Sequence, residues 1–264
     1  MIDLHAHLLP GVDDGPTTWD EALEMVRMAA ADGVTAMVAT SHMMPGDAYP
    51  NTRERLLALT AELRERVRAE GIAMDIYPGA EVFMTLDTAE RLARGELLTY
   101  CDANRYLLLE MPATEMPAYA VNVIDDLRLQ GVTPIIAHPE RNLDIIQRPS
   151  LAQALVERGA LLQVTASSLR AAPPVRAAAR FLMGRGLVHF LASDAHGIYH
   201  RRPRVGSYLD LACEWVGKTA VERMVIHNPA AVLAGKPLEP YRDSGRRMRA
   251  RGLLQSMVQR LTAR

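Results

Sequence analysis

The 264-residue chain has little cysteine, no long hydrophobic run and no strong excess of charge. Its two cysteines, Cys101 and Cys213, lie far apart in the sequence, which favours a reducing compartment over a disulfide framework. No apolar stretch approaches the roughly 20 residues that a bilayer-spanning helix needs. The first residues lack the basic and apolar regions of a signal peptide, so we expect a cytoplasmic protein.

Several functional motifs are also missing. The net charge of −1 gives no general attraction to nucleic acid or to an anionic membrane. A cysteine-based phosphatase needs an arginine six positions after its cysteine, and Leu107 and Thr219 occupy those positions here. The chain contains neither GxxxxGK[ST] nor GxGxxG, so a phosphate-binding nucleotide loop is unsupported.

Short apolar runs alternate with longer helical segments along the chain. We expect seven strands over residues 2–7, 34–40, 73–82, 105–111, 132–138, 160–166 and 187–193. We expect helices over residues 18–31, 51–70, 87–94, 117–130, 149–158, 174–185, 206–216 and 219–226. Five helices are followed by a glycine that suits a helix C-cap, namely Gly33, Gly71, Gly131, Gly159 and Gly186. This alternation predicts parallel βαβ units, either in a barrel or in an open doubly wound sheet.

The last residues differ in composition from the rest. We expect one domain over residues 1–240 and a basic helix or tail over residues 241–264. From Arg242 onward the chain carries seven arginines and one acid, with apolar residues at helical spacing from Leu254 to Leu261. A helix packed on the domain is the simpler interpretation. A docking surface for an anionic membrane or a partner protein is the alternative.

Histidines and acids occur where the predicted strands end. His5 and His7 lie two residues apart in the first strand, so their side chains point to one face, together with that of Asp3. Later strands supply His42, Glu81, Glu110, His138, Asp194 and His196 at or just past their ends. Because the C-terminal strand ends of an α/β fold gather at one rim, we expect these side chains to lie together.

This residue set predicts a metal site. Imidazole and carboxylate ligands without a thiolate suit Mn, Fe or Zn. There are too many ligands for one ion, whereas two or three ions bridged by carboxylates fit the number. Clustered divalent ions of this kind recur in enzymes that hydrolyse phosphate esters.

Each residue also has a structural interpretation. Glu81 and Glu110 could form ion pairs with arginines, and His138 could be a hydrogen-bonded core histidine. Asp194 and His196 could cap a following helix. The remaining histidines are interpreted as a packed strand residue (His189), a helix cap (His227) and an unassigned loop residue (His200).

As a set, the motifs resemble a known family. DLHAH, DDG, TSH, GAE, LLLEMP, IIAHPERN and FLASDAH are similar to the PHP (polymerase and histidinol phosphatase) superfamily. They resemble more closely its bacterial capsule-type members, the metal-dependent protein-tyrosine phosphatases of the CpsB/CapC family. The resemblance covers residues 1 to about 230. It implies a distorted seven-stranded β/α barrel with the metal site at the C-terminal strand ends, and manganese as the usual ion.

The resemblance further implies three metal positions. The implied ligands are His5, His7, Glu81 and Asp194 for the first ion, Glu81, Glu110 and His138 for the second, and Asp14, His42 and His196 for the third. Asp14 is preferred to its neighbour Asp13 because the acid of the family directly precedes a glycine, as Asp14 precedes Gly15.

The implied reaction is hydrolysis of a phosphate ester by a hydroxide that bridges two metal ions. Arg141 would bind the phosphate, although an ion pair with Glu140 is an alternative. Arg201 fits the position of a second phosphate-binding arginine, and Arg202 is its rival. Either of two histidines, His42 or His196, could protonate the leaving oxygen.

The implied substrate is a phosphotyrosyl protein, in particular the tyrosine-rich tail of a kinase that regulates capsule or exopolysaccharide synthesis. The alternatives are a small phosphomonoester, such as histidinol phosphate, and a non-catalytic binding module stabilised by metal. One departure from the family is TSHMMPG, where Met43 replaces a second histidine. We expect a changed loop there and no lost metal. Nothing in the sequence indicates an oligomeric state.

The basic tail lies outside the resemblance, so we expect it to be dispensable for chemistry. A chain lacking residues 243–264 should hydrolyse a small aryl phosphate at the rate of the full-length protein. Steady-state kinetics on p-nitrophenyl phosphate test this expectation. A truncated protein that is folded but inactive would show that the tail supports the active site.

Overall fold

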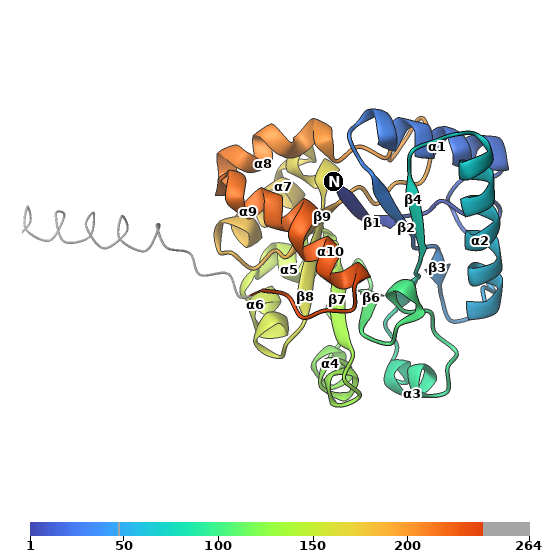
Figure 1. Ribbon diagram of the computed structural model, residues 1–264. Coiled ribbons are helices and arrows are strands. Elements are labelled where there is room, and N and C mark those ends of the chain that lie inside the picture. The colour runs from blue at the N-terminus through green and yellow to red at the C-terminus, as the bar shows by residue number, and fades with distance from the viewer. Residues whose placement is uncertain (47, 240–264) are drawn as a thin grey trace, which may run out of the picture.

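The structure is a computed structural model that describes residues 1–46 and 48–239. Short strands at the centre are surrounded by helices (Figure 1). All strand pairs are parallel, and the strands form two sheets with the orders β1-β2-β4 and β3-β5-β6-β7-β8-β9. The strands are β1 (Ile2–Ala6), β2 (Ala36–Ala39), β3 (His42–Met43), β4 (Asp75–Pro78), β5 (Glu81–Phe83), β6 (Tyr106–Glu110), β7 (Thr133–Ala137), β8 (Leu161–Thr165) and β9 (Phe190–Ala192).

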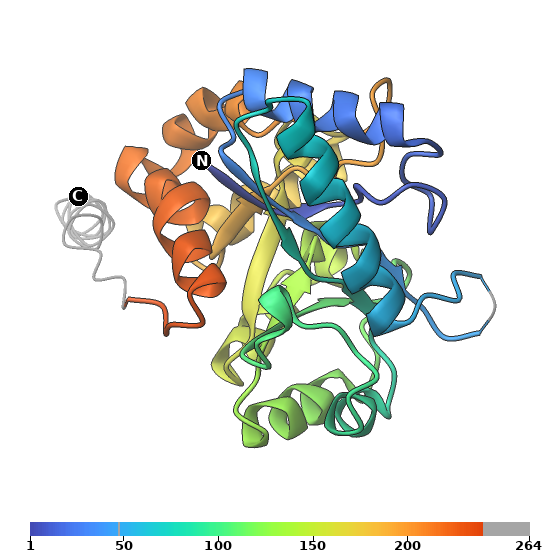
Figure 2. The same cartoon turned by 45° about the vertical axis from the view of Figure 1, so that its right-hand side comes forward.

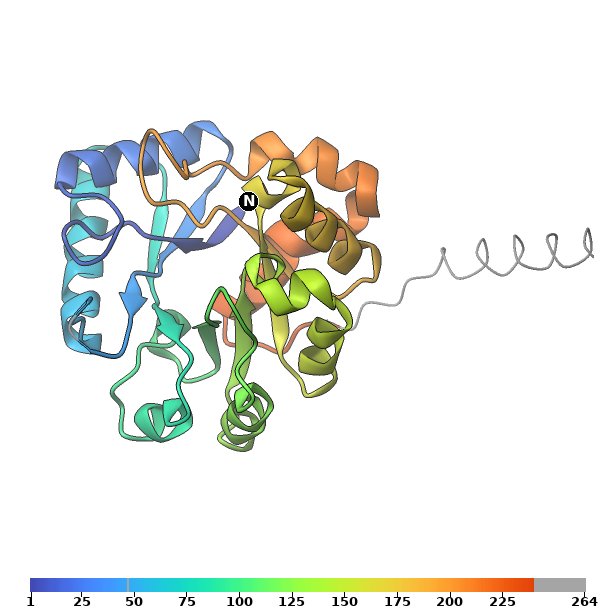
Figure 3. The same ribbon diagram turned by 180° about the vertical axis from the view of Figure 1, so that it is seen from behind.

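The helices lie on the outside of the strands. They are α1 (Trp19–Ala31), α2 (Arg53–Ala69), α3 (Thr88–Ala93), α4 (Ala120–Leu129), α5 (Leu143–Gln147), α6 (Ser150–Glu157), α7 (Pro173–Gly184), α8 (Leu209–Val216), α9 (Lys218–Glu222) and α10 (Asn228–Leu233). In Figures 2 and 3, α1 and α2 lie at one side of the strands, and α7 and α8 lie at the other. Every predicted helix is present, and α5 and α10 were not predicted. Among the described residues, no helix has both the length and the apolar character of a membrane span.

One predicted strand is divided in two. The run over 73–82 becomes β4 and β5, whereas the run over 34–40 becomes β2 and is followed by the short, unpredicted β3. At Gly79, between β4 and β5, a Cβ atom would lie 2.7 Å from Cγ1 of Val38. The chain therefore passes so close to β2 that only glycine fits. The prediction of an α/β fold with parallel strands is confirmed, whereas the run over 73–82 was wrongly predicted to be continuous.

The first and last strands are tied together by backbone hydrogen bonds. The amide of Asp194 donates to the carbonyl of His5 at 2.8 Å, and the amide of His7 donates to the carbonyl of Ala195 at 2.8 Å. A parallel bridge pairs Ala6 with Ala195. The segment that follows β9 thus lies beside the end of β1.

The strands are buried on both faces. In β6, Tyr106 and Leu108 belong to one hydrophobic cluster, and the alternate residues Leu107 and Leu109 belong to another. The smaller cluster also includes Val232 of α10. Burial on two faces explains why the strands read as nearly continuous apolar runs.

Helix ends follow the predicted glycine pattern. The five glycines predicted as C-caps all have positive φ, from 64° at Gly71 to 92° at Gly159, a conformation that residues with a Cβ rarely adopt.

Cys101 and Cys213 are both free thiols. The predicted basic helix or tail over 241–264 lies outside the described residues.

One helix end is bound by a distant loop. The Asp32 carboxylate, just after α1, accepts hydrogen bonds from the amides of Val205, Gly206 and Ser207 at 2.6–3.2 Å and from the Ser207 hydroxyl at 2.8 Å. A Cβ at Gly206 would collide with the Asp32 carbonyl oxygen. Asp32 therefore fixes the loop that runs from His196 to α8.

Replacing Asp32 with alanine should destabilise the protein, because three amides and a hydroxyl lose their shared acceptor. We expect the free energy of unfolding to fall by about 1–3 kcal/mol. Urea denaturation followed by circular dichroism measures the change. Asp126→Ala, at an exposed position of α4, is the matched control and should unfold like the unmodified protein. Equal unfolding midpoints for the two variants would contradict this role of Asp32.

Candidate metal centre

The predicted site residues lie at one rim of the fold. His5 and His7 lie in and just after β1, His42 begins β3, and Glu110 ends β6. The others follow strand ends, namely His138 after β7 and Asp194 and His196 after β9, with Asp14 in the loop after β1. Glu81 differs from the prediction, because it begins β5 and does not end a strand. Its register partner is His42, which brings it to the same rim.

The innermost group is fully buried. The Nε2 atoms of His5 and His7 are 3.3 Å apart, and each lies 3.2 Å from Oε2 of Glu81. Oδ1 of Asp194 lies 3.3 Å from His5 Nε2 and 3.9 Å from His7 Nε2. These four residues each direct one ligand atom at a common point, so they could hold a single metal ion.

Glu81 connects this group to a second one. Its Oε1 atom lies 2.9 Å from Nε2 of His138, and its Oε2 atom lies 3.4 Å from Nδ1 of His42. Glu110 lies next to both histidines, 3.6 Å from His42 and 3.9 Å from His138. His42, Glu81 and Glu110 form a group that could bind metal. His42 therefore lies beside the second group, although the resemblance assigned it to the third metal position.

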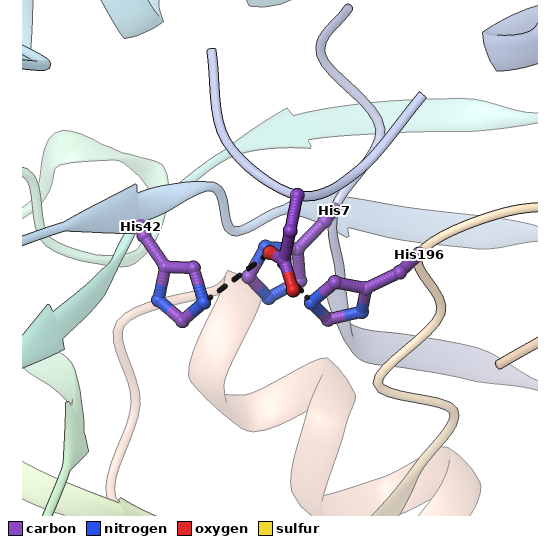
Figure 4. Close-up of side chains that lie close together, drawn as sticks. His7, His42 and His196 are labelled. Carbon is purple, nitrogen blue, oxygen red and sulfur yellow. Dashed lines mark ion pairs between the residues drawn. The ribbon is translucent and has the colours of Figure 1, made fainter. Parts of the chain in front are cut away.

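The third group lies further out. Oδ1 of Asp14 is 3.2 Å from Nε2 of His196 and 3.6 Å from Nε2 of His42. Figure 4 shows His42 and His196 joined by dashed lines to the same carboxylate, with His7 beside them. The ring centroids of His7 and His196 are 3.7 Å apart. These four residues are again close enough to share one ion.

Asp13 has a different environment from Asp14. Its side chain is buried, and its Oδ2 atom lies 2.8 Å from Nδ1 of His7. It therefore contacts the nitrogen of His7 that faces away from Glu81. Asp14 is half exposed and faces the histidines of the third group. Asp14 therefore stays the expected ligand, and Asp13 the residue that contacts His7 from behind.

Two further polar residues hold β1 in place. Nδ1 of His5 lies 2.8 Å from Oε1 of Gln163 in β8. The Asp3 carboxylate accepts hydrogen bonds from the amides of His5 and Ser193, so Asp3 does not join the metal groups as its spacing suggested. Sequence reasoning missed Gln163, although a lone glutamine in the apolar run ALLQVTA was a usable signal.

The acids of the centre differ in their pKa values. Burial opposes ionisation of Glu81, but the rings of His5 and His138 hold its pKa well below the usual range. Burial is likewise outweighed at Asp194, where two histidines and two arginines keep the pKa far below its usual value. Burial and the adjacent Glu81 charge instead raise the pKa of Glu110 to about 7.

The histidines differ in the same way. Against burial, Asp13 and Glu81 raise the pKa of His7 to about 10, and Glu81 raises that of His138 to about 9. Burial and the nearby His7 lower the pKa of His42 to about 4. Protons on some rings therefore balance the buried carboxylates, and a divalent cation would balance them in the same place.

The donor set fits divalent metal ions. Among the described residues, three buried atoms of the centre have ion-pair contacts at 3.2–3.6 Å but no hydrogen bond, namely Glu81 Oε2, His42 Nδ1 and His196 Nε2. Buried polar atoms without hydrogen bonds are costly, and metal coordination would satisfy them. Imidazole and carboxylate ligands suit Mn, Fe or Zn.

Two arginines reach the centre. Nη1 of Arg141 lies 2.5 Å from Oδ2 of Asp194, and Nη2 of Arg201 lies 2.8 Å from both oxygens of that carboxylate. Arg202 instead donates to the carbonyl of Tyr199. The alternative pairing of Arg141 is not seen, because the buried Glu140 carboxylate accepts from the Thr165 amide. Both arginines line a cavity of about 250 Å³ together with Asp14, His42, Glu110 and His138.

Three site residues have unusual backbones. His138, Asp194 and Arg201 have φ values of 31°, 53° and 46°, in the left-handed region that residues with a Cβ rarely adopt. Asp194 is not a helix cap, because its carboxylate binds His5 and the two arginines. Strained backbones often occur at functional sites, because the surrounding structure holds the side chains in place.

The other predictions near the site have mixed outcomes. Met43 is buried in the hydrophobic core and does not face the centre, and the Tyr49 ring stacks parallel to His42 with centroids 5.6 Å apart. His227 occupies the N-cap position of α10, as predicted, but its side chain makes no capping hydrogen bond. His189 lies just before β9, where its Nδ1 accepts from the Leu162 amide. His200 is exposed.

Comparisons with known proteins agree on one family. Residues 1–234 match the model of a family described as capsular polysaccharide synthesis, CpsB/CapC. The tyrosine-protein phosphatase YwqE of Bacillus subtilis (strain 168) is 37% identical over 203 residues, which cover 76% of this chain and 79% of YwqE. The tyrosine-protein phosphatase CpsB of Streptococcus pneumoniae is 27% identical over 242 residues, which cover 88% of this chain and 98% of CpsB.

A solved structure has the same fold. It comes from a study of YwqE from Bacillus subtilis and CpsB from Streptococcus pneumoniae, which describes them as unique metal-dependent tyrosine phosphatases. The superposition has a TM-score of 0.85 at 33% identity and covers 90% of this chain and 96% of that chain.

If the centre binds divalent ions, manganese should stabilise the folded protein, because the site is assembled from strands that separate on unfolding. At a free ion concentration 100 times the dissociation constant, one site adds about 2.7 kcal/mol. Thermal unfolding with and without Mn²⁺, after chelation, measures the effect. Glu81→Gln should remove most of the metal-dependent rise in the unfolding midpoint, and an equal rise in the variant would contradict the central place of Glu81.

Proposed function

Because the chain belongs to the CpsB/CapC family, we propose that it is a metal-dependent protein-tyrosine phosphatase. One observation carries the proposal. Glu81 lies at the junction of groups of imidazole and carboxylate side chains, beside a cavity into which Arg141 and Arg201 both project. Ligands for metal ions and side chains for a phosphate group therefore meet in one place.

We assign the ions to three positions. His5, His7, Glu81 and Asp194 would hold the first, Glu81, Glu110 and His138 the second, and Asp14, His42 and His196 the third. The interatomic distances support the first and third sets. At the second position His138 contacts Glu81 at 2.9 Å, and His42 is a further candidate ligand. The closeness of His42 to Glu81 and of His7 to His196 indicates that neighbouring positions share residues. Two or three ions fit the number of ligands. We propose manganese as the resident ion, with Fe or Zn compatible with the same ligands.

When bound, the ions would supply Lewis acidity, lowering the pKa of a water molecule and neutralising charge on the phosphate. Arg141 and Arg201 would hold the non-bridging phosphate oxygens, since a guanidinium can bind two of them at once. Both now bind Asp194, so they already lie near the buried acids. His42 or His196 is the expected proton donor to the leaving oxygen, although burial lowers the pKa of both rings and so disfavours their protonated forms. Phenolate needs this help less than an alkoxide because the pKa of a tyrosine hydroxyl is about 10.

We propose a phosphotyrosyl protein as substrate, in particular the tyrosine-rich tail of a bacterial kinase that acts in capsule or exopolysaccharide synthesis. The family description and the names of YwqE and CpsB support this choice. We also propose a cytoplasmic location, where such a kinase tail would be accessible. Contact of the basic tail over 241–264 with a membrane surface or partner remains part of this proposal.

We further propose that the two sheets form one distorted seven-stranded barrel within a single domain over residues 1–240. In this description, β2 with β3 and β4 with β5 each count as one bent strand. The bridge between Ala6 and Ala195 supports the proposal, because it places the last strand beside the first.

The proposal predicts that His138→Ala and Glu110→Ala fold normally but hydrolyse phosphotyrosyl peptide at least about 100-fold more slowly, since even the loss of a second-shell partner costs 10–100-fold. Steady-state kinetics with Mn²⁺ measure the loss. The matched control is His200→Ala, an exposed histidine that should retain full activity. Unchanged turnover in His138→Ala would mean that the second metal position is misassigned.

The same assay separates the alternatives. Preferred hydrolysis of histidinol phosphate over phosphotyrosyl peptide would favour a small-molecule phosphatase. Lack of turnover of any phosphate ester by metal-loaded protein would favour a non-catalytic binding module.

A further inference from the structure

Asp13, the first acid of the DDG sequence, makes three polar contacts. The Oδ2 atom of Asp13 contacts Nδ1 of His7 at 2.8 Å and accepts the backbone amide of His42 at 3.0 Å. Its Oδ1 atom accepts the amide of Gly15 at 3.0 Å. These three groups belong to three segments of the chain, the end of β1, the start of β3 and the turn that presents Asp14.

Each of these contacts positions a residue of the third group. His7 and His42 are two of its members, and the Gly15 amide directly follows another member, Asp14. His7 is also a member of the innermost group. The buried carboxylate of Asp13 thus fixes residues of two candidate metal positions relative to each other.

The Asp13 carboxylate also determines which ring nitrogen of His7 is free to bind a metal ion. A neutral histidine that binds metal through Nε2 carries its proton on Nδ1. Oδ2 of Asp13 is placed to accept that proton, so Nε2 directs its lone pair toward Glu81 and Asp194. Carboxylate partners of this kind orient metal-binding histidines in many proteins.

Residue 15 lies so close to Asp13 that this position requires glycine. A Cβ on residue 15 would lie 2.9 Å from Oδ1 of Asp13 and 3.1 Å from both Cβ and the carbonyl oxygen of His7. The turn therefore packs directly against the carboxylate and His7. This contact gives a structural reason for the glycine of DDG.

We infer that Asp13 is a positioning residue that couples the innermost and outer metal positions, an inference that rests on the proposed metal-dependent function. Asp13 does not bind an ion itself, because its oxygens are used by His7, His42 and Gly15. It sets the tautomer of His7 and the distance between His7, His42 and Asp14. Loss of Asp13 should weaken metal binding without removing a ligand.

Asparagine is the informative substitution because it has the same shape. Three N–H groups converge on Asp13, and an asparagine offers one oxygen and one NH₂ group. In Asp13→Asn the NH₂ group must face at least one of these donors. Either the turn loses a hydrogen bond, or His7 moves its proton to Nε2, where it can no longer bind metal.

The experiment measures Mn²⁺ binding to purified full-length protein by titration calorimetry and by elemental analysis at saturation. Asp13→Asn is compared with its neighbour Asp14→Asn, which changes the same charge one residue away. We expect Asp13→Asn to bind Mn²⁺ about 10–100-fold more weakly and to regain the full number of ions at saturation. Asp14→Asn should lack one ion at every concentration.

Gly15→Ala is a second variant that keeps every side chain of the centre. It should weaken Mn²⁺ binding in the same direction, and it replaces Asp13→Asn if that variant does not fold. Wild-type affinity in the variants that fold would overturn the inference. So would loss of an ion from saturated Asp13→Asn while Asp14→Asn keeps all of them, because Asp13 would then be the ligand.

The inference and the proposed function fail in different ways. The binding measurement needs no substrate. A wild-type protein that binds Mn²⁺ but does not hydrolyse phosphotyrosyl peptide would refute the proposed function alone. An Asp13→Asn variant with unchanged Mn²⁺ affinity and full phosphatase activity would refute the inference alone.

Discussion

The site depends on the burial of one carboxylate. Glu81 is almost completely buried, and its two oxygens face His5, His7, His42 and His138. A buried ionised carboxylate is costly unless it is paired or hydrogen-bonded. The imidazoles that converge on Glu81 supply this pairing, and the strands that carry them meet at the same rim. Protons or divalent cations can supply the required charge, which connects the stability of the fold with its chemistry.

The bends in the strands make this convergence geometrically feasible. The break between β4 and β5 turns the chain at Gly79, so that Glu81 begins a new strand in register with His42. The left-handed backbone at His138 and Asp194 similarly turns each side chain immediately after its strand. These local departures from regular strand geometry thus direct the side chains at the strand ends toward the candidate metal centre. The rest of the fold, with both faces of its strands buried, holds these departures in place.

Much of the fold was predictable because parallel strands in a two-sided core have a distinct pattern. The apolar runs and the helix-ending glycines located the elements, and the His and acid residues after the runs located the rim. The bend at Gly79 was not predictable, since it arises from the close approach of Val38, 41 residues earlier in the chain. The contacts of Asp13 were not predictable, because adjacent acids differ only in which distant groups they face. Gln163 was missed although its polarity within an apolar run was visible, because the sequence does not identify its partner His5, which lies 158 residues away.

The pairing of the first strand with the segment after β9 has a consequence for protein synthesis. His5 and His7 are translated long before Asp194 and His196. The backbone bonds between His5 and Asp194 and between His7 and Ala195 cannot form before then. A nascent chain therefore exposes two closely spaced imidazoles for most of its translation without the acid that completes their group. The complete ligand group therefore exists only after Asp194 has been translated.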